Sequence, residues 1–354
     1  MPSEVRAVQE LVKDGHMNAV PEDYILPEEE RPKLADGVSA DHALPVIDMK
    51  GVEGERRGFI VEQIREACAQ WGFFQVTNHG VPLPLIARMQ QVSREFFELP
   101  LEDKMKYRSP NEEQMLVSEG YGTKVAAKKG AFANWGDQLR HKSLPASQRN
   151  YDRWPTNPSS FREIEEGYIE EQDKLVKRIL ELISESLGLE SSYLNDHLVG
   201  KLTQTLLMNY YPHCPQPELV LGVQRHSDFG LLTLLVQDVD DAPGLQVTKD
   251  GDWITVMPMD GAVIVNLGDQ MEMLSNGKYK SIEHRAFVTG SKPRMSIVAF
   301  TYPTDETVVG PISDLLSAEE LPKYGRCSFG EYRSSFIASS GAHGKSHIQS
   351  MAIV

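Results

Sequence analysis

Between residues 203 and 302 the chain consists mostly of short apolar segments separated by turns, and this pattern limits the folds open to it. Leu, Val, Ile and aromatic residues fill each segment, while Gly, Pro, Asp and Asn occupy the breaks. Turns that recur at intervals of about 8–12 residues are typical of all-β sandwiches and barrels. The sequence predicts strands over residues 205–210, 219–226, 231–237, 245–248, 253–256, 262–267, 284–288 and 296–302.

Two of these segments carry side chains that suit a metal. His226 and Asp228 are two residues apart in an extended segment, so their side chains project to the same face. His284 supplies a second imidazole on a later strand. Two histidines and one carboxylate, leaving three positions of the metal open, form the ligand set of non-haem Fe(II) oxygenases. A His-x-Asp pair alone is weak evidence, because many strands carry such a pair on a solvated face.

Arg294 and Ser296 repeat this spacing at the start of the last predicted strand, beside an apolar run that ends at Phe300. An arginine that faces the interior of a barrel needs an anion, because an unpaired buried charge is costly. A carboxylate bound by both arms of the guanidinium group meets that need. The Arg-x-Ser pair therefore indicates a carboxylate ligand.

The His-x-Asp pair, the distal histidine and the Arg-x-Ser pair are specific as a set. The set resembles the 2-oxoglutarate-dependent Fe(II) dioxygenases, in particular the large plant group that includes the flavonoid and gibberellin oxidases. The resemblance runs from about residue 45 to residue 303 and is strongest to the flavone synthase I and flavanone 3-hydroxylase type. Other segments that carry it are Trp71-Gly72-Phe73-Phe74, Asn209-Tyr210-Tyr211-Pro212, Pro243-Gly244-Leu245-Gln246-Val247 and Asn266-Leu267-Gly268-Asp269.

The resemblance implies an α+β fold with a double-stranded β-helix (jelly-roll) core, braced by N-terminal helices and a C-terminal helix. We expect one structural unit with three parts: a helical N-terminal region with a few strands over residues 1–202, the jelly-roll catalytic core over 203–305, and a C-terminal helix and tail over 306–354. Outside the core, the sequence predicts strands at 45–48 and 73–76 and helices at 5–11, 57–71, 83–97, 160–187 and 191–198.

Several further segments carry structural expectations. Ser159 or Ser160 is a candidate N-cap for the long helix. The stretch 118–139 is expected to be irregular, and loops at 239–243 and 268–280 are expected to cross the open end of the barrel. A helix is expected near 318–322 and a last one over 331–337, while the tail from residue 341 is expected to lack order.

The resemblance also implies a chemistry. His226, Asp228 and His284 would bind Fe(II), and 2-oxoglutarate and O2 would be cosubstrates, with ascorbate as reductant. Succinate and CO2 would be released, and no protein acid or base beyond the metal centre is required. The cosubstrate-binding residues implied by the resemblance are Arg294, Ser296, Tyr211 and Asn209.

The substrate is predicted less directly. Candidate pocket residues are Phe300, Phe229, Tyr121, Leu207, Gln138 and Arg140, each also compatible with simple packing. An apolar pocket with few charges fits a flat phenolic better than a carboxylated substrate, which would require another cation. A flavanone, desaturated to a flavone or hydroxylated at C-3, is therefore the first candidate. Alternatives are hydroxylation or dealkylation of another phenolic, an alkaloid or a hormone.

Two alternatives come from other classes of protein. One is a catalytically inactive ligand-binding protein on the same fold, and the complete metal triad together with the Arg294 and Ser296 pair argues against it. The other is a cupin-like isomerase or storage protein, which would have no use for the Arg-x-Ser pair.

Composition sets the remaining expectations. The net charge of −15 disfavours a nucleic-acid or anionic-membrane partner. No apolar run is long enough for a membrane span. Cys68, Cys214 and Cys327 are widely spaced without a C-x-x-C pair, which is typical of reduced thiols. We expect a cytoplasmic monomer that acts on a small aromatic molecule.

Overall fold

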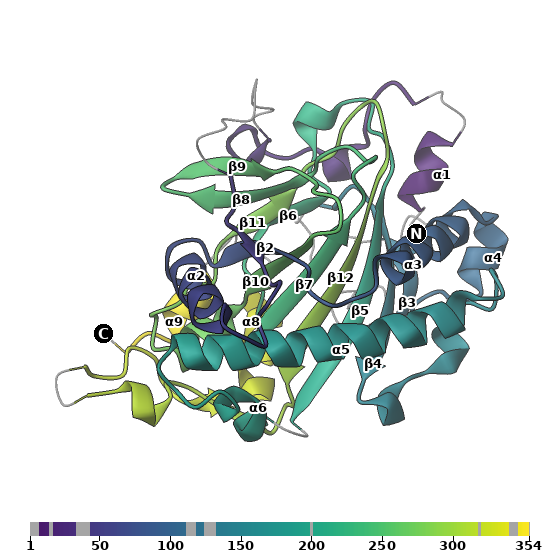
Figure 1. The fold of residues 1–354 in the computed structure, drawn as a ribbon. Helices are drawn as coiled ribbons and strands as arrows, with labels where there is room; N and C mark the ends of the chain where they lie inside the picture. Colours follow the sequence, from purple (N-terminus) through teal and green to yellow (C-terminus); the bar gives the residue numbers. More distant parts are fainter. Residues whose placement is uncertain are drawn as a thin grey trace.

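Two β-sheets form the centre of the molecule, with the longest helix lying across the larger one (Figure 1). The computed structural model describes residues 7–13, 17–32, 43–110, 118–123, 132–198, 201–317, 320–339 and 346–353. No helix in these ranges is long and apolar enough to cross a membrane.

The larger sheet has eight strands and unites both halves of the chain. Its order is β1 (Val46–Asp48), β2 (Phe73–Thr77), β10 (Val263–Leu267), β7 (Leu232–Gln237), β12 (Arg294–Pro303), β5 (Leu202–Tyr211), β4 (Asp137–Leu144) and β3 (Gly120–Thr123). All pairings are antiparallel except that of β1 with β2.

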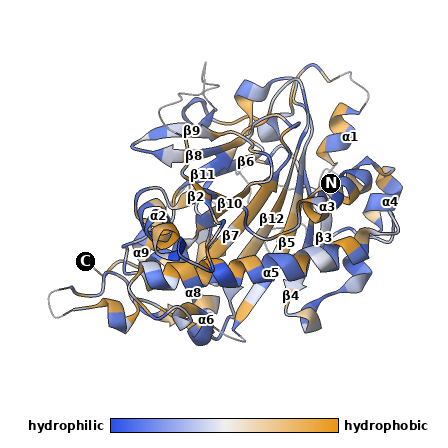
Figure 2. Cartoon of the chain, viewed as in Figure 1, coloured by the Kyte–Doolittle hydropathy of each residue, from blue (hydrophilic) through white to orange (hydrophobic). Residues whose placement is uncertain are grey.

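The smaller sheet has four strands and faces the larger one. Its order is β6 (Val223–His226), β11 (His284–Ala286), β8 (Leu245–Lys249) and β9 (Asp252–Val256). Strands β7 and β12 are mainly hydrophobic, whereas β8 and β9 are more hydrophilic (Figure 2). A further short pair joins β13 (Val308–Val309) to β14 (Cys327–Ser328).

The two faces of the larger sheet have different roles, as β12 illustrates. Alternate residues of a strand point to opposite faces. Met295, Ile297 and Ala299 join the main hydrophobic core, whereas Ser296, Val298 and Phe300 line a pocket between the sheets. A shift of one residue in register would exchange these two sets, so core burial also fixes which side chains reach the pocket.

Helices cover the outer face of the larger sheet. The main core contains buried residues of α2 (Arg57–Gln70), α3 (Leu83–Glu98) and α5 (Phe161–Ser186) together with those of β7, β10 and β12. Burial of each large apolar side chain here contributes about 1.5–3 kcal/mol. The remaining helices are α1 (Val8–Val12), α4 (Leu101–Met105), α6 (Tyr193–Leu198), α7 (Asp269–Leu274), α8 (Phe329–Ser339) and α9 (Ser346–Ser350).

The structure corrects the sequence predictions in several segments. The stretch 118–139 contains β3 and the start of β4, and residues 268–280 contain α7. Residues 217–219 form a 3-10 turn before β6, so the strand predicted from 219 is shorter. Ser160 makes no capping hydrogen bond. Residues 320–322 are not helical, and 318–319 lie outside the described residues.

The prediction of a disordered tail is wrong for its last part. Residues 341–345 lie outside the described ranges, but α9 follows them. Ile348 is buried in a cluster with Tyr332, Phe329 and Met273, which explains why this segment is helical and packed.

Candidate active site

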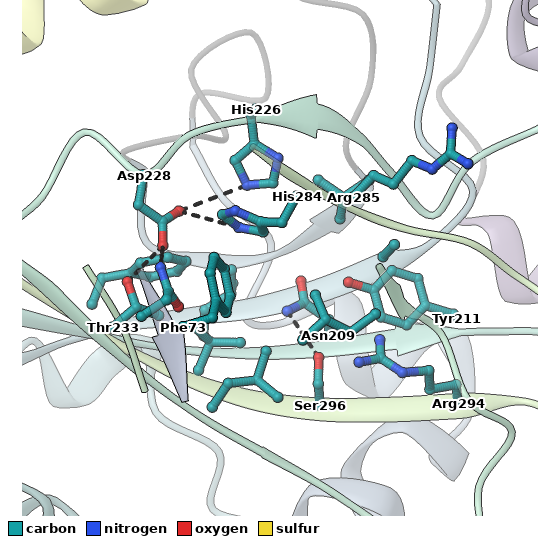
Figure 3. A pocket seen from close by; sticks show the side chains of 18 residues that line it. Phe73, Asn209, Tyr211, His226, Asp228, Thr233, His284, Arg285, Arg294 and Ser296 are labelled. Atoms are coloured by element: carbon teal, nitrogen blue, oxygen red, sulfur yellow. Dashed lines mark hydrogen bonds and ion pairs between the residues drawn. The ribbon is translucent and has the colours of Figure 1, made fainter. Parts of the chain in front are cut away.

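His226 and His284 lie opposite each other on neighbouring strands of the smaller sheet. The antiparallel register of β6 and β11 pairs the two residues directly, and Asp228 follows two residues after His226. One carboxylate oxygen of Asp228, Oδ1, lies 3.7 Å from Nε2 of each histidine (Figure 3). The three ligand atoms all lie within 4.8 Å of one another.

Hydrogen bonds to the backbone orient both imidazole rings. Nδ1 of His226 lies 2.8 Å from the carbonyl oxygen of Gln224, and Nδ1 of His284 lies 3.1 Å from that of Ile282. A carbonyl only accepts, so each Nδ1 carries the proton and donates. Each Nε2 is therefore the unprotonated nitrogen and lies on the side of Asp228, as a metal ligand requires.

Two hydrogen bonds to Oδ2 orient the carboxylate of Asp228. Oδ2 accepts hydrogen bonds from Thr233 (2.6 Å) and Asn266 (2.8 Å), which leaves Oδ1 facing the histidines. Burial alone would raise the pKa of Asp228, but the charge that His284 and His226 carry when protonated, together with these two hydrogen bonds, outweighs it and lowers the pKa. The group is thus held ionised, which suits a metal-binding carboxylate.

These donors fit an iron(II) ion. Two neutral imidazoles and one carboxylate on one side of the ion leave its other positions for small ligands. The side chain of His226 is 33% exposed, whereas Asp228 is 5% exposed, so the site opens on the side of β6. On the other side, the ring of Phe73 meets His284 edge-on, with ring centroids 5.2 Å apart.

A buried arginine lies at one end of the same pocket. Arg294 is 3% exposed; Nη2 donates to Gln237 at 3.2 Å and Nε has no hydrogen-bond partner. Its guanidinium carbon lies 5.2 Å from the centre of the Tyr211 ring. Burial lowers the pKa of Arg294, partly opposed by Tyr211 and Asp241. A buried cation with an unused donor indicates an anionic ligand at this position.

Asn209, Ser296 and Gly244 complete this end of the pocket. Asn209 donates from Nδ2 to Ser296 Oγ at 3.4 Å, and the two residues are paired in register across β5 and β12. A Cβ on Gly244 would lie 2.4 Å from Cδ of Arg294, so only glycine leaves room for the arginine.

The pocket between these two groups is bounded mainly by apolar side chains. Leu207 of β5 and Val298 and Phe300 of β12 extend its wall away from Arg294. The register of β12 and β7 pairs Phe300 with Thr233, the residue that binds Asp228. Phe300 therefore lies level with the metal ligands. The other lining residues include Phe73, Val223, Leu235, Leu245, Asn266, Arg285 and Ala286.

The structure brings together most of the residues nominated from the sequence. His226, Asp228, His284, Asn209, Tyr211, Arg294, Ser296, Leu207 and Phe300 all line this one pocket. Gln138 and Arg140 do not line it directly, but β4 pairs them with Asn209 and Leu207, on the same face of the sheet.

Two further nominated residues, Tyr121 and Phe229, also do not line the pocket. Tyr121 is paired with Leu139 on the outer face and packs against Phe96 and Phe97 of α3, so its assignment to the pocket is wrong. Phe229 is not among the lining residues. Its ring stacks on Tyr302 with centroids 5.3 Å apart, in an aromatic cluster beneath α8.

Sequence reasoning missed the residues that support the ligands. Thr233 and Asn266 fix Asp228, and Phe73 packs on His284. Asn266 and Phe73 lie in segments that carry the family resemblance, but nothing in the sequence shows that Asn266 donates to Asp228. That contact depends on the neighbouring positions of β10 and β7 in the sheet.

Comparison with known proteins agrees with this geometry. Residues 202–303 match the 2OG-Fe(II) oxygenase superfamily, and residues 44–157 match the N-terminal region described for a non-haem dioxygenase in morphine synthesis. The chain is 41% identical to jasmonate-induced oxygenase 4 of Arabidopsis thaliana, with 99% of this chain and 98% of that protein covered.

The chain belongs to the 2OG-Fe(II) oxygenase superfamily. This oxygenase is also 40% identical to flavanone 3-dioxygenase 2 of Oryza sativa subsp. japonica, over 95% of each chain. The crystal structure of JOX2 in complex with 2OG, Fe and JA superposes with a TM-score of 0.89 at 38% identity, covering 100% of this chain and 99% of JOX2.

The family membership confirms several expectations. The protein is a dioxygenase with Fe(II) and 2-oxoglutarate as cofactor and cosubstrate, on a jelly-roll α+β fold. When bound, these groups supply the oxidising power, with release of succinate and CO2. The protein's own residues orient the ligand atoms, hold a carboxylate charge at Asp228 and offer a cation at Arg294.

Proposed function

We propose that this oxygenase couples conversion of 2-oxoglutarate to succinate and CO2 with oxidation of a small aromatic metabolite, a flavanone being the first compound to test. The observation that carries the proposal is the position of Phe300. Its ring lies on the pocket wall at the level of the metal ligands, beside Leu207 and Val298. An aromatic face among apolar side chains favours stacking of a flat ring.

Within this proposal, the two ends of the pocket have separate tasks. His226, Asp228 and His284 bind the iron, and Arg294 pairs with the distal carboxylate of 2-oxoglutarate, assisted by Ser296, Tyr211 and Asn209. The unused Nε of Arg294 and the closeness of Tyr211 and Gly244 support this assignment. A bidentate arginine–carboxylate pair would satisfy the donor that the fold leaves open.

The nature of the relatives supports a specialised-metabolite substrate. A flavanone 3-dioxygenase is 40% identical over nearly the whole chain, which favours a flavanone. JOX2 binds JA in its structure, which keeps a hormone as the alternative. The free cysteines Cys68, Cys214 and Cys327 support the further proposal that the enzyme acts in the reducing cytosol. We also propose that it is a monomer.

A coupled assay tests the flavanone directly. Purified protein with Fe(II), ascorbate and 2-oxoglutarate is incubated with and without naringenin, and succinate and organic products are followed by mass spectrometry. Naringenin should stimulate succinate formation. A product that has lost two hydrogen atoms means desaturation, and one that has gained an oxygen atom means hydroxylation. Succinate that naringenin does not stimulate would remove the flavanone and keep the dioxygenase.

A further inference from the structure

A second buried arginine lies on the inner face of the larger sheet, beyond the apolar wall of the pocket. Arg140 of β4 is 4% exposed and is paired in register with Leu207, which lines the pocket. Its guanidinium carbon lies 6.0 Å from the centre of the Phe300 ring. Arg140 thus borders the wall on which we place the substrate ring, on the side away from Arg294.

The charge of Arg140 lacks a carboxylate partner. Its guanidinium hydrogen-bonds the hydroxyl of Tyr302, and Nε has no hydrogen-bond partner. Among the described residues, no carboxylate lies within salt-bridge distance of it; Glu119 exerts only a weaker long-range effect and accepts a hydrogen bond from the backbone of Lys142. Burial lowers the pKa of Arg140, which reflects the cost of this desolvated cation.

Arg285 is also buried, at 5% exposed, and no carboxylate among the described residues lies within salt-bridge distance of it. Its Nε, however, donates to Gln246 at 2.8 Å, and its guanidinium carbon lies 4.1 Å from the centre of the Trp253 ring. Two less deeply buried arginines have anions. Arg94 binds both Asp238 and Asp241, at 3.0 and 2.8 Å. Arg149 also lies over an aromatic ring, that of Trp154, but its Nη1 is 3.5 Å from Glu166. A buried cation left without such a partner destabilises a fold by several kcal/mol in general, so its retention indicates a ligand. Arg294 shows the same combination of burial and an unused Nε.

We propose that Arg140 binds a carboxylate of the organic substrate, so that the substrate of this oxygenase is a ring-bearing carboxylic acid. The inference rests on the proposed function and narrows its substrate class. It also differs from the expectation that a pocket with few charges fits a flat phenolic better than a carboxylated substrate. A neutral flavanone would leave Arg140 unpaired, and the two substrate classes can therefore be separated by experiment.

The sheet geometry gives the size of such a molecule. Asp228 is bound by Thr233 of β7, and Arg140 is on β4, with β12 and β5 between them. Three strand spacings correspond to about 14 Å. A molecule with one or two rings spans this distance, with its carboxylate at Arg140, its ring on Phe300 and the bond to be oxidised at the metal. Arg294, six residues before Phe300 on the same strand, remains free for 2-oxoglutarate.

Binding of matched ligand pairs tests the proposal. The probes are aryl and phenylpropanoid carboxylic acids, each with its own methyl ester, added anaerobically to the protein loaded with Mn(II) and 2-oxoglutarate. Binding is measured by the shift in melting temperature and by calorimetry. The wild-type protein should bind at least one acid about tenfold or more tightly than its ester, because only the acid forms the charge-assisted pair. The Arg140→Met variant, which keeps the apolar stem, should bind the acid and the ester equally.

Two controls separate recognition from structure. Arg149→Met removes an arginine that also lies over an aromatic ring but outside the pocket, and should leave the preference for acids unchanged. Without ligand, Arg140→Met should melt no lower than wild type, since it removes an unpaired buried charge. A purely structural Arg140 predicts a lower melting temperature and no effect on acid selectivity.

The outcomes are decisive in both directions. An acid preference that disappears in Arg140→Met supports the proposal. Equal binding of acids and esters by the wild type, an undiminished preference in Arg140→Met, or no binding of any acid in the panel overturns it. The proposed function is tested separately, by succinate formation without any organic substrate. That reaction can persist when the Arg140 proposal fails.

Discussion

At the scale of single residues, backbone carbonyls determine how the metal ligands work. His226 and His284 each donate from Nδ1 to the carbonyl two residues earlier, which directs both Nε2 atoms to Asp228. Hydrogen bonds within the protein therefore orient both imidazole rings. Arg294 is also oriented by its neighbours: it donates to Gln237, lies over the Tyr211 ring and occupies the space that a side chain at Gly244 would fill.

Substitutions at the two ends of the pocket should have different effects on iron binding and on 2-oxoglutarate binding. Asp228→Ala should lose bound iron and all activity, because it removes one of three ligands. Arg294→Ala should keep iron but raise the KM for 2-oxoglutarate by roughly 30-fold or more, since truncating one side of a buried charge pair costs about 2–5 kcal/mol. Iron content by metal analysis and succinate kinetics measure the two effects. Equal loss of iron in both variants would contradict the assignment of Arg294.

A methyl group added at residue 244 should displace the side chain of Arg294. In Gly244→Ala, the new Cβ would lie 2.4 Å from Cδ and 2.7 Å from Nε of Arg294, which forces the guanidinium to move. We expect a raised KM for 2-oxoglutarate with normal iron binding. Gly58→Ala is the matched control, because its Cβ meets nothing within 4 Å and α2 should gain about 0.5–1 kcal/mol. An unchanged KM in Gly244→Ala would show that Arg294 has more freedom than the structure indicates.

At the scale of elements, apolar periodicity predicted most of the fold. The core strands and helices α2, α3 and α5 follow it closely. β4 escaped prediction because its sequence, Asp-Gln-Leu-Arg-His-Lys-Ser-Leu, is polar although it is mostly buried. Two of its polar side chains bond to distant partners: His141 to Glu165, and Ser143 to Gln204. A sequence alone cannot show those partners, so the strand resembles a loop.

The N-terminal helix should depend on one buried carboxylate. Asp137 at the start of β4 accepts hydrogen bonds from the backbone amides of Val8 and Gln9, both 2.9 Å, and from Thr123 at 2.7 Å. Asp137→Ala leaves these donors unpaired and should lower the free energy of unfolding by about 2–4 kcal/mol. Asp152→Ala, at an exposed position, should change it by less than about 0.5 kcal/mol. Urea denaturation measures both free energies. Equal stability of the two variants would show that the hydrogen bonds of Asp137 to Val8, Gln9 and Thr123 do not stabilise the fold.

At the scale of the whole molecule, the site depends on how the two sheets face each other. The sequence indicated the metal triad and the cosubstrate residues, because their spacing on strands is visible in it. It did not indicate that residues 137–144 form strand β4 of the larger sheet. It therefore did not predict that Arg140 could bind an anionic group of the substrate. Register across β4, β5 and β12 is a tertiary property, and it places Arg140 beside Phe300.

Ligands that bind both sheets should stabilise the whole fold. The proposed metal ligands belong to β6, to the segment directly after it and to β11. Arg294 and its neighbours Asn209, Tyr211 and Gln237 belong to the larger sheet. Mn(II) and 2-oxoglutarate, each at about a hundred times its Kd, should each add about 2.7 kcal/mol of stability. Thermal unfolding should show both increments in wild type, whereas in Arg294→Ala a roughly 30-fold weaker affinity reduces the 2-oxoglutarate increment to about 0.9 kcal/mol and leaves the metal increment unchanged. A full 2-oxoglutarate increment in that variant would place the cosubstrate elsewhere.

Succinate formation is the measurement that tests the central claim most directly. Purified protein is supplied with Fe(II), ascorbate, 2-oxoglutarate and O2, and wild type is compared with Asp228→Ala. We expect slow succinate release by the wild type even without an organic substrate, acceleration when the substrate is added, and none from the variant. Absence of succinate under every condition, or equal formation by Asp228→Ala, would contradict oxidation at the site formed by His226, Asp228 and His284.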